Sequence, residues 1–435
     1  MYSIHTFLLQ KELFRSPEPV KTTVVSSFTD TPALQQIARQ ADSDYILFYT
    51  GTSPIELHPY AIGRMYQIAE SNDGALFYSD YQEIRQGKKI HHPTLEYQTG
   101  SIRNDFDFGQ LLLFRNDSFQ QVVAQMNTDY RFAALYELRL SISRLGKIVH
   151  IPETLYTVQP TDLRLSGEKQ FDYVDPANRE VQLEMEAVCT AHLQAIGAWL
   201  APEFQRIDFG QENFAREASV IIPVRNRKRT IAEAVESALQ QQTDFSFNVI
   251  VVDNHSTDGT GQILTELSRR YPNLIHHIPA STELGIGGCW TEAILLPECG
   301  KFAIQLDSDD LYKDCHVLQR IVDTFYQENC AMVIGSYQMV DFKLEEIPPG
   351  LIAHREWTPD NGRNNALRIN GLGAPRAFYT PVLRQIKFPN VRRLCNRPGH
   401  FTKIPHRPYL RSPVFMPALG RKFRSRSGHT ATEQL

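Results

Sequence analysis

An acidic run directly after an apolar segment is the strongest candidate for chemistry in this sequence. Asp307, Ser308 and Asp309 follow residues 302–306 (FAIQL), which predict a buried strand. Carboxylates at the carboxyl end of a parallel strand face the crevice where α/β proteins bind ligands. Two such acids can share one Mg²⁺ or Mn²⁺, which prefers oxygen ligands and keeps positions open for phosphate oxygens. A solvated acidic turn, or a helix N-cap at Asp310, is the alternative explanation.

A second polar turn has a similar setting. Asp253 ends the apolar run 248–253 (NVIVVD), and Ser256 and Asp258 lie in the turn before a predicted helix. An acid at a strand end followed by a polar turn can bind the base or ribose of a nucleoside through hydrogen bonds. Ser256 or Asp258 can also serve as a helix N-cap, and the two roles are compatible.

Basic and glycine residues add weaker signals. Pro223 ends the run 219–223 (SVIIP), and Arg225 and Arg227 follow it. Either arginine can contact a diphosphate, although an exposed basic turn explains them equally well. Gly285, in the segment LGIGGCW, allows a close backbone approach to a ligand.

The segments that carry these residues alternate between two periodicities. Strands are predicted at 219–223, 248–253 and 302–306, and helices at 230–240 and 259–271. Strands that alternate with helices predict a mostly parallel sheet flanked by helices, which is an α/β fold of the Rossmann-like kind.

The first half of the chain resembles the second half in a weakened form. Three ungapped blocks occur in the same order in both halves: 44–53 on 301–310, 75–82 on 331–338, and 109–122 on 373–386. The sequence thus predicts two related α/β modules. The first has Thr50, Gly51, Thr52 and Ser53 where the second has its acids. We therefore expect the first module to hold no cation and to serve packing, assembly or acceptor binding.

The composition excludes several classes of protein. The 435 residues suffice for two or three domains, and a formal net charge of −4 argues against a general nucleic-acid binder. Six cysteines without a Cys-x-x-Cys pair favour a reducing cytoplasm over a disulfide framework. The N-terminus has no signal-peptide pattern, and no apolar run approaches ~18 residues. The sequence predicts a cytoplasmic protein and leaves association with a membrane surface open.

Four segments of the second half, SVIIPVRN, VIVVDNHSTDGT, LGIGGCWTEA and LDSDD, together resemble the family 2 glycosyltransferases, which have the GT-A fold. The resemblance runs from residue 219 to about residue 335, with a looser extension to residue 391. A mild departure is Cys299, where the family usually has alanine. The first half resembles a degenerate GT-A-like copy.

The resemblance assigns roles to individual residues. It implies that Pro223 and Asn226 shape the nucleotide pocket and that Asp253 binds the base or ribose. It makes Asp307 and Asp309 the family's Asp-x-Asp motif, with Asp309 as the main ligand of Mn²⁺ or Mg²⁺. The predicted nucleotide-sugar site comprises Pro223, Arg225, Asn226, Asp253, Ser256, Gly285, Asp307 and Ser308.

Residues 368–378 (RINGLGAPRAF) correspond in position to the acceptor side of such enzymes. Gly373 would shape a loop there, and Arg376 would meet an anionic acceptor or the diphosphate. A structural turn with a surface arginine is equally consistent with the sequence of this segment.

The implied activity is a glycosyltransferase, expected to be inverting, that moves a sugar from a nucleotide-diphosphate-sugar to an acceptor hydroxyl in glycan or cell-surface polysaccharide synthesis. The acceptor would be a glycan, a lipid-linked molecule or a small molecule. A non-catalytic nucleotide-sugar-binding or scaffold protein is the alternative. A nucleotidyltransferase would need a glycine- and lysine-rich phosphate loop, which residues 219–230 do not provide. The fold does not set the sugar, the nucleotide or the acceptor.

The final segment departs from the family pattern. The family usually has a Glu-Asp pair shortly after this point, whose aspartate is the catalytic base, and no such pair follows Val391. Residues 392–435 are instead rich in Arg, Pro, His and Ser, without a clear helical or strand period. Back-translation from Arg392 in a shifted register permits EDYAIGLAISRKYRIGRIYE, which contains the pair and matches residues 140–153 (LSISRLGKIVHIPE). We therefore predict a frameshifted, disordered tail that lacks the base; an ordinary basic disordered tail is the alternative.

The predicted organisation has four parts. They are a degenerate GT-A-like module at 1–158, a helical connector at 159–217, a truncated family 2 catalytic module at 218–391, and an aberrant tail at 392–435.

Overall fold

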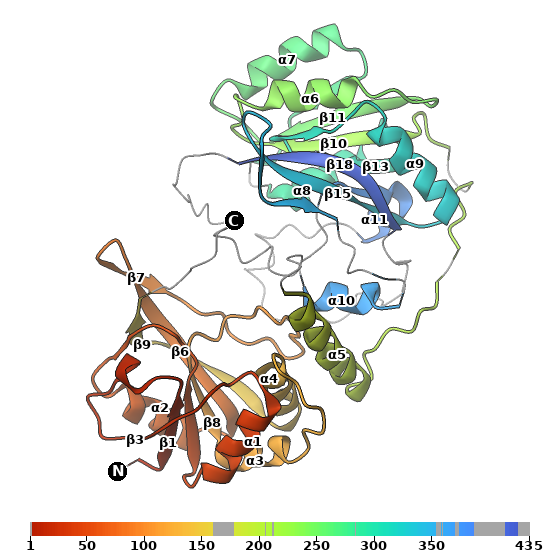
Figure 1. Ribbon diagram of the computed structural model, residues 1–435. Helices are drawn as coiled ribbons and strands as arrows, with labels where there is room; N and C mark the ends of the chain where they lie inside the picture. Colours follow the sequence, from red (N-terminus) through yellow and green to blue (C-terminus); the bar gives the residue numbers. More distant parts are fainter. Residues whose placement is uncertain are drawn as a thin grey trace. The chain divides into compact units, whose positions relative to one another are not determined.

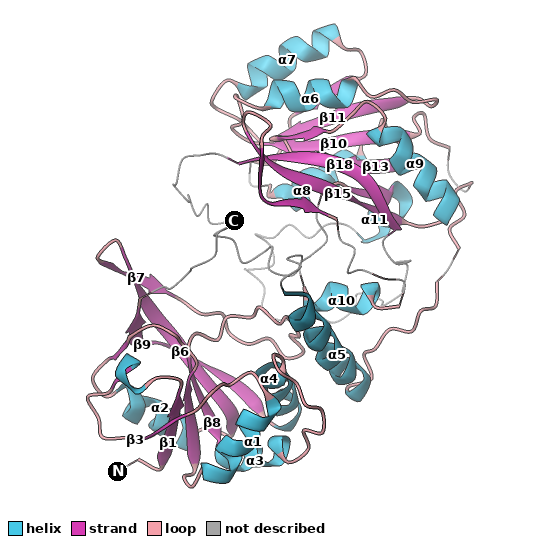
Figure 2. Ribbon diagram, in the orientation of Figure 1, coloured by secondary structure: helices cyan, strands magenta, loops and turns pink. Residues whose placement is uncertain are grey.

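A computed structural model describes residues 2–159, 178–204, 206–210, 213–282, 284–353, 358, 360–369, 374–386 and 414–424. The chain divides into two compact units, residues 1–199 with 367–370 and residues 200–366 with 371–435. Each unit has its own sheet and its own helices (Figures 1 and 2).

The second unit is built on one mixed sheet. Its strands are β10 (Ala218–Val224), β11 (Phe247–Asp253), β12 (Leu274–His277), β13 (Phe302–Gln305), β14 (Asp310–Tyr312), β15 (Met332–Asp341), β16 (Glu346–Ile352), β17 (Arg376–Tyr379) and β18 (Val414–Arg424). They follow the order β12-β11-β10-β13-β17-β15-β18-β14, with β16 beside β15. Neighbours are parallel from β12 to β13, and β17 is antiparallel to both β13 and β15. The predicted α/β class is confirmed. The sheet is mixed beyond β13, where β15 and β18 pair in parallel but β17, β14 and β16 run antiparallel to their neighbours. Hydrophobic periodicity does not report strand direction.

Helices cover both faces of this sheet. They are α6 (Ile231–Leu239), α7 (Thr260–Arg270), α8 (Ile286–Leu295), α9 (Val317–Glu328) and α11 (Thr380–Ile386). The short helix α10 (Gly362–Arg368) spans the point at which the chain passes from the second unit to the first. Side chains of α6, α7 and α9 pack with alternate strand residues such as Val220 and Ile304. Side chains of α8 and α11 pack with the intervening residues, such as Ile221 and Ala303. Strands buried on both faces are apolar along their whole length, which is why they were visible in the sequence.

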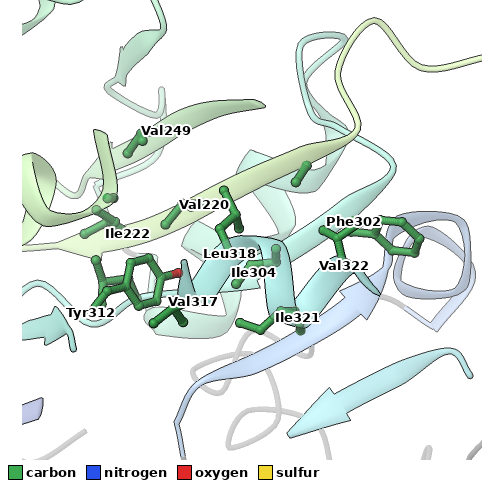
Figure 3. Close-up of a cluster of buried hydrophobic side chains, with 14 of the residues drawn as sticks. Val220, Ile222, Val249, Phe302, Ile304, Tyr312, Val317, Leu318, Ile321 and Val322 are labelled. Atoms are coloured by element: carbon green, nitrogen blue, oxygen red, sulfur yellow. The ribbon is translucent and has the colours of Figure 1, made fainter. Parts of the chain in front are cut away.

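The larger of these two clusters holds the central strands against α9. Figure 3 shows side chains of β10, β11 and β13 gathered with those of α9 and β14. The labelled residues are Val220, Ile222, Val249, Phe302, Ile304, Tyr312, Val317, Leu318, Ile321 and Val322. Phe302 stacks on Phe325 of α9 with ring centroids 4.3 Å apart. This packing fixes β13, whose carboxyl end leads into the acidic run.

The first unit has a sheet of the same kind. Its strands are β1 (Ile4–Leu8), β2 (Phe14–Arg15), β3 (Lys21–Val24), β4 (Tyr45–Tyr49), β5 (Ile55–Leu57), β6 (Gly74–Arg85), β7 (Lys88–His92), β8 (Leu111–Arg115) and β9 (Lys147–Val158). Its helices are the 3-10 turn η1 (Lys11–Leu13), α1 (Thr31–Gln40), α2 (Ala61–Glu70), α3 (Asn116–Val123), α4 (Ala134–Leu145) and α5 (Arg179–Ala195). The strand order is β2-β5-β9-β6-β8-β4-β1-β3, with β7 beside β6.

The two sheets share the topology of a series of seven strands, while the outer strands β2 and β12 have no counterpart in the other sheet. The series β3-β1-β4-β8-β6-β9-β5 has the same sequence of parallel and antiparallel neighbours as β11-β10-β13-β17-β15-β18-β14. The three repeated sequence blocks fall on β4 and β13, on β6 and β15, and on β8-α3 and β17-α11. A duplicated module would produce this agreement.

Two segments differ from expectation. The helix α5, expected within a connector, groups with the first unit, because its Val188, Cys189 and Leu193 are buried against Tyr136 and Leu140. Val414–Arg424, expected to lack regular structure, forms β18 between β15 and β14. The segment begins with a mostly apolar run, VFMPAL, of the composition typical of strands. The rest of the predicted tail lies outside the described residues. Among the described helices, none is long and apolar enough to cross a membrane.

Truncation of a strand side chain tests the central packing of the second unit. Ile304 is fully buried, so Ile304→Ala should lower the free energy of unfolding by ~2–5 kcal/mol through lost burial and an unfilled cavity. Ile278, with 55% of its surface exposed, provides the control, and Ile278→Ala should change stability far less. Urea denaturation of both variants measures the difference, and equal midpoints would contradict the packing described.

Candidate functional site

The register of three parallel strands brings the predicted polar residues to one edge of the second unit. Val224, the last residue of β10, lies beside Asp253, the last residue of β11. On the other side of β10, Ile221 lies beside Gln305, the last residue of β13, two residues before Asp307. The loops after β11 and β13 therefore flank the end of β10, where the sheet's strand order reverses direction.

The loops after β10 and β11 are tied together by hydrogen bonds. Asn226 donates its backbone N–H to Ser256 Oγ at 2.9 Å, and its side-chain Oδ1 accepts from the N–H of Thr257 at 2.7 Å. Arg227 N donates to Thr260 Oγ1 at 2.9 Å. Asn226 has a φ of 56°, a left-handed conformation that asparagine adopts more readily than most residues. The predicted site residues Asn226 and Ser256 thus contact each other directly.

Asp258 fastens the same two loops to the start of α7. Its Oδ1 accepts from the N–H and Oγ1 of Thr260 at 3.0 and 2.6 Å, and its Oδ2 accepts from Lys228 N at 3.0 Å. Hydrogen bonds from the Thr260 hydroxyl and the two backbone N–H groups stabilise the carboxylate and lower the pKa of Asp258 to about 2. The N-cap alternative for Asp258 is wrong by one residue, because Gly259 is the N-cap of α7, but the carboxylate of Asp258 still accepts the N–H of the first helical residue, Thr260.

Asp253 is buried at the end of β11. Its Oδ1 accepts from Ser256 N at 2.9 Å, and its Oδ2 lies 3.5 Å from Nε2 of His276 on β12. Burial by itself raises the pKa of Asp253, but the contacts with His276 and Ser256 outweigh it, so the pKa lies below its ordinary value. The sequence analysis missed His276, because nothing in the run LIHH indicates that β12 pairs with β11.

Asp307 is held by a buried amide. Gln305 Nε2 donates to Asp307 Oδ1 at 2.6 Å, and Gln305 Oε1 accepts from Arg376 Nε at 2.8 Å. Burial lowers the pKa of Arg376, and the negative charge of Asp307 acts in the opposite direction. Arg376 was predicted to face an acceptor or the diphosphate, or to be a surface residue. Its guanidinium instead points towards Gln305, because β17 pairs with β13 and carries Arg376 opposite that residue.

The other acids of the run point differently. Asp309 has 36% of its side-chain surface exposed and lies 3.9 Å from Nε of Arg227, so the loops after β10 and β13 meet through this pair. Ser308 and Asp310 are buried, and Asp310 begins β14. Of the two arginines suggested by the sequence, Arg227 is the one that approaches an acid of the site.

The remaining predicted residues lie around this edge. Pro223 is half-buried within β10, and Arg225 is exposed in the following loop. Gly285 is the N-cap residue of α8, and a Cβ built on it would meet open space. Packing against the protein therefore does not require glycine at position 285. Gly373 lies outside the described residues.

Two carboxylates fit a cation that completes its coordination with substrate oxygens. In the described part of the chain no cluster of three or more Asp, Glu, His or Cys side chains could enclose a metal. Mg²⁺ typically uses one or two carboxylates together with phosphate oxygens and water, so a cage is not required. The exposed carboxylate of Asp309 and the second oxygen of Asp307 meet that requirement.

The first unit has no such pair at the matching place. At the end of β4, Thr50 donates its N–H to the carbonyl of Gln110, and Tyr49 donates its hydroxyl to the carbonyl of Ser53. A Cβ on Gly51 would lie 2.2 Å from Oε1 of Gln110, so the side chain of Gln110 fills the space beside this turn. Neutral side chains pack the position that the acids occupy in the second unit.

The pKa of Asp258 predicts how the loop arrangement responds to acid. Because its folded pKa of about 2 lies below its ordinary value of 3.8, the stabilisation from Asp258 is fully present above pH ~3.8. It is lost as the pH falls through about 2. The stability difference between the wild type and Asp258→Ala should therefore be constant from pH 7 to ~5 and shrink below ~4. Denaturation at each pH measures it, and a difference that grew in acid would contradict the assignment.

Comparisons with known proteins concern the region that carries these residues. Residues 219–388 match the model of the family described as glycosyl transferase family 2. An uncharacterised glycosyltransferase of Nostoc sp. is 32% identical over 123 residues, 28% of this chain and 37% of the relative. A poly(ribitol-phosphate) beta-glucosyltransferase of Bacillus spizizenii is 25% identical over 170 residues, 39% of this chain and 26% of the relative. The chain spans only about a third of the length of such curated relatives.

Solved structures also match parts of this chain. A structure of residues 1–349 of S. aureus TarS in complex with UDP-GlcNAc has 21% sequence identity and a TM-score of 0.37, and the match covers 50% of this chain and 62% of TarS 1–349. A mannosyltransferase of Pyrobaculum calidifontis in complex with GDP-Man and Mn²⁺ has 16% identity and a TM-score of 0.34, over 60% of this chain and 70% of that one. The family match and the sequence relatives carry the assignment. Residues 219–388 of this chain are a glycosyl transferase family 2 domain.

Proposed function

We propose that this chain transfers a sugar from a nucleotide-diphosphate-sugar to an acceptor hydroxyl, with inversion at the anomeric carbon. The observation that carries the proposal is the meeting of Asp253, Asp307 and Asp309 at neighbouring strand ends, within the region matched by the family. The names of two relatives, a poly(ribitol-phosphate) beta-glucosyltransferase and a minor teichoic acid biosynthesis protein, support cell-surface polysaccharide synthesis as the process.

The loops after β10 and β11 would bind the nucleoside. Asp253 is held as an anion in a fixed orientation by Ser256 and His276, which suits a carboxylate that accepts hydrogen bonds from a base or ribose. Asn226 holds the adjoining loop in place. Arg227, exposed and next to Asp309, would lie near the diphosphate.

Asp309, with Asp307, would hold the divalent cation. Bound there, Mn²⁺ or Mg²⁺ would supply positive charge to the departing diphosphate. This chain's own contribution would be to place the two carboxylates, with Asp307 held by the neutral amide of Gln305. The first unit, with only neutral oxygens at 50–53, would take no part in donor binding.

The acceptor hydroxyl must lose a proton as it attacks the anomeric carbon and the sugar–phosphate bond breaks. We assign this step to an acidic residue encoded after codon 391 in a shifted reading frame. The family match ends at residue 388, close to the start of the proposed shift. Gly373, within the predicted acceptor side, would shape the acceptor loop.

Replacement of Asp309 tests the cation site. Asp309→Asn should weaken UDP or GDP binding in Mn²⁺ by about tenfold or more, because it removes a charged ligand. Asp323→Asn, on α9 and bonded to Gln319, is the matched control and should bind like the wild type. Isothermal calorimetry with Mn²⁺ and with EDTA measures both variants. Equal wild-type affinity in the two buffers would remove the metal role.

The same titration examines the first unit. We expect one nucleotide site in the whole chain. Asp309→Asn should therefore show no Mn²⁺-dependent nucleotide binding with the affinity of the wild type. A full second site in that variant would show that the first unit binds a nucleotide.

Sequencing of the gene around the Val391 codon tests the proposed shift. We expect Glu-Asp codons in a neighbouring register, and we expect the chain as written to bind donor while transferring sugar weakly or not at all. Release of UDP or GDP from nucleotide sugars measures transfer. Robust sugar transfer by the 435-residue chain, or the absence of Glu-Asp codons in every register, would contradict the proposed frameshift.

A non-catalytic nucleotide-sugar-binding protein is the second candidate, favoured by the missing Glu-Asp pair. The two candidates differ in one result. A chain with its downstream frame restored should transfer sugar if the enzyme assignment is right, and should only bind if the protein is a scaffold.

A further inference from the structure

Gln305 occupies a place where an apolar residue would be expected. It lies on β13, in a run whose other members, such as Phe302 and Ile304, form the core, and only 4% of its surface is exposed. Its side chain joins two charged groups, the Asp307 carboxylate and the Arg376 guanidinium. A buried polar group is costly unless it is hydrogen-bonded, and here both ends of the amide are.

The charges on either side dictate the orientation of this amide. The NH₂ group donates to the carboxylate and the carbonyl accepts from the guanidinium, at 2.6 and 2.8 Å. A flipped amide would set its carbonyl against the Asp307 carboxylate and its NH₂ against Arg376, and both contacts would be repulsive. Arg376 therefore fixes Gln305, and Gln305 fixes Asp307.

The arrangement orients the Asp307 side chain without a direct ion pair. Of its two carboxylate oxygens, only Oδ1 has a hydrogen-bond partner within the described structure. Oδ2 stays available to a ligand, and Arg376 is joined to the carboxylate only through the neutral amide of Gln305. A direct ion pair with Arg376 would compete with a ligand for the same charge.

The first unit provides an internal comparison. In the aligned blocks, Gln305 corresponds to Phe48, Asp307 to Thr50, and Arg376 to Leu112. Phe48 and Leu112 face each other across β4 and β8, as the position of Arg376 faces that of Gln305 across β17 and β13, and both are buried in the core. Where the acid is absent, the two polar partners are also absent, so the pair serves the acid rather than the fold.

We propose that Gln305 and Arg376 are positioning residues for the donor site, acting through Asp307 to present one carboxylate oxygen in a fixed direction. The proposal rests on the donor-binding function assigned above. It replaces an acceptor-binding role for Arg376 with one inside the donor site.

A double-mutant cycle tests this coupling. Gln305→Met keeps the length of the side chain and removes both hydrogen bonds, and it should weaken Mn²⁺–UDP or Mn²⁺–GDP binding about tenfold. In an Asp307→Asn background the same change should weaken binding less than twofold, because there is no carboxylate left to position. Arg376→Met should weaken binding in the same direction by freeing the amide to rotate.

A matched buried glutamine separates positioning from stability. Gln241 is 7% exposed and bonds to the Ser237 and Asp314 carbonyls, away from the acidic run. Gln241→Met should lower the unfolding temperature and leave nucleotide affinity unchanged. Should Gln305→Met fail to fold, Arg376→Met and its cycle with Asp307→Asn carry the test.

The outcomes distinguish a failure of the positioning role from a failure of the proposed donor binding. No binding of either nucleotide by the wild type would refute the donor site itself. Wild-type binding with an unchanged Gln305→Met, or an equal loss in both Asp307 backgrounds, would overturn the positioning role and leave the donor site standing.

Discussion

The parallel register of β10 with its two neighbours is the constraint on which the second unit depends. Because Val224 lies beside Asp253 and Ile221 beside Gln305, the chain after each strand begins at the same edge of the sheet. Residues more than fifty positions apart in sequence thereby become neighbours. The strand register already brings the loops close together, and hydrogen bonds between them fix their final positions. The packing of α9 on β13 supports this register, since Phe302 and Ile304 are fully buried in one cluster with the side chains of α9.

The parts of the fold that could be predicted are those whose signal is local. The runs at 219–223, 248–253 and 302–306 fall within β10, β11 and β13 except for one residue, because strands buried on both faces are continuously apolar. The polar turns after them were likewise recognisable. Partners supplied by other strands were not. His276 reaches Asp253 only because β12 pairs with β11, and Arg376 reaches Gln305 only because β17 enters the sheet antiparallel to β13.

The two units show how one topology can carry different chemistry. Seven strands of each sheet agree in order and direction, so the architecture alone does not decide which of the two units binds a ligand. The difference lies in the turn after one strand, where Thr50 and Thr52 stand in place of Asp307 and Asp309. Without a carboxylate, the first unit closes that turn with its own groups, and Gln110 packs over Gly51. The position of the proposed ligand site in the second unit is thus filled by the protein's own groups in the first.

The two units also differ in whether the matching pair of residues on their central strands is apolar or polar. An apolar pair such as Phe48 and Leu112 stabilises a sheet through burial alone, whereas a half-buried arginine and a buried glutamine contribute only if their hydrogen bonds are made. Removal of one partner leaves another buried polar group unsatisfied, at a cost of ~1–3 kcal/mol. A chain under selection for stability alone would favour the apolar pair. The proposed positioning role accounts for Arg376 and Gln305 in the second unit, because an apolar pair could not hydrogen-bond the carboxylate of Asp307 and so could not orient it.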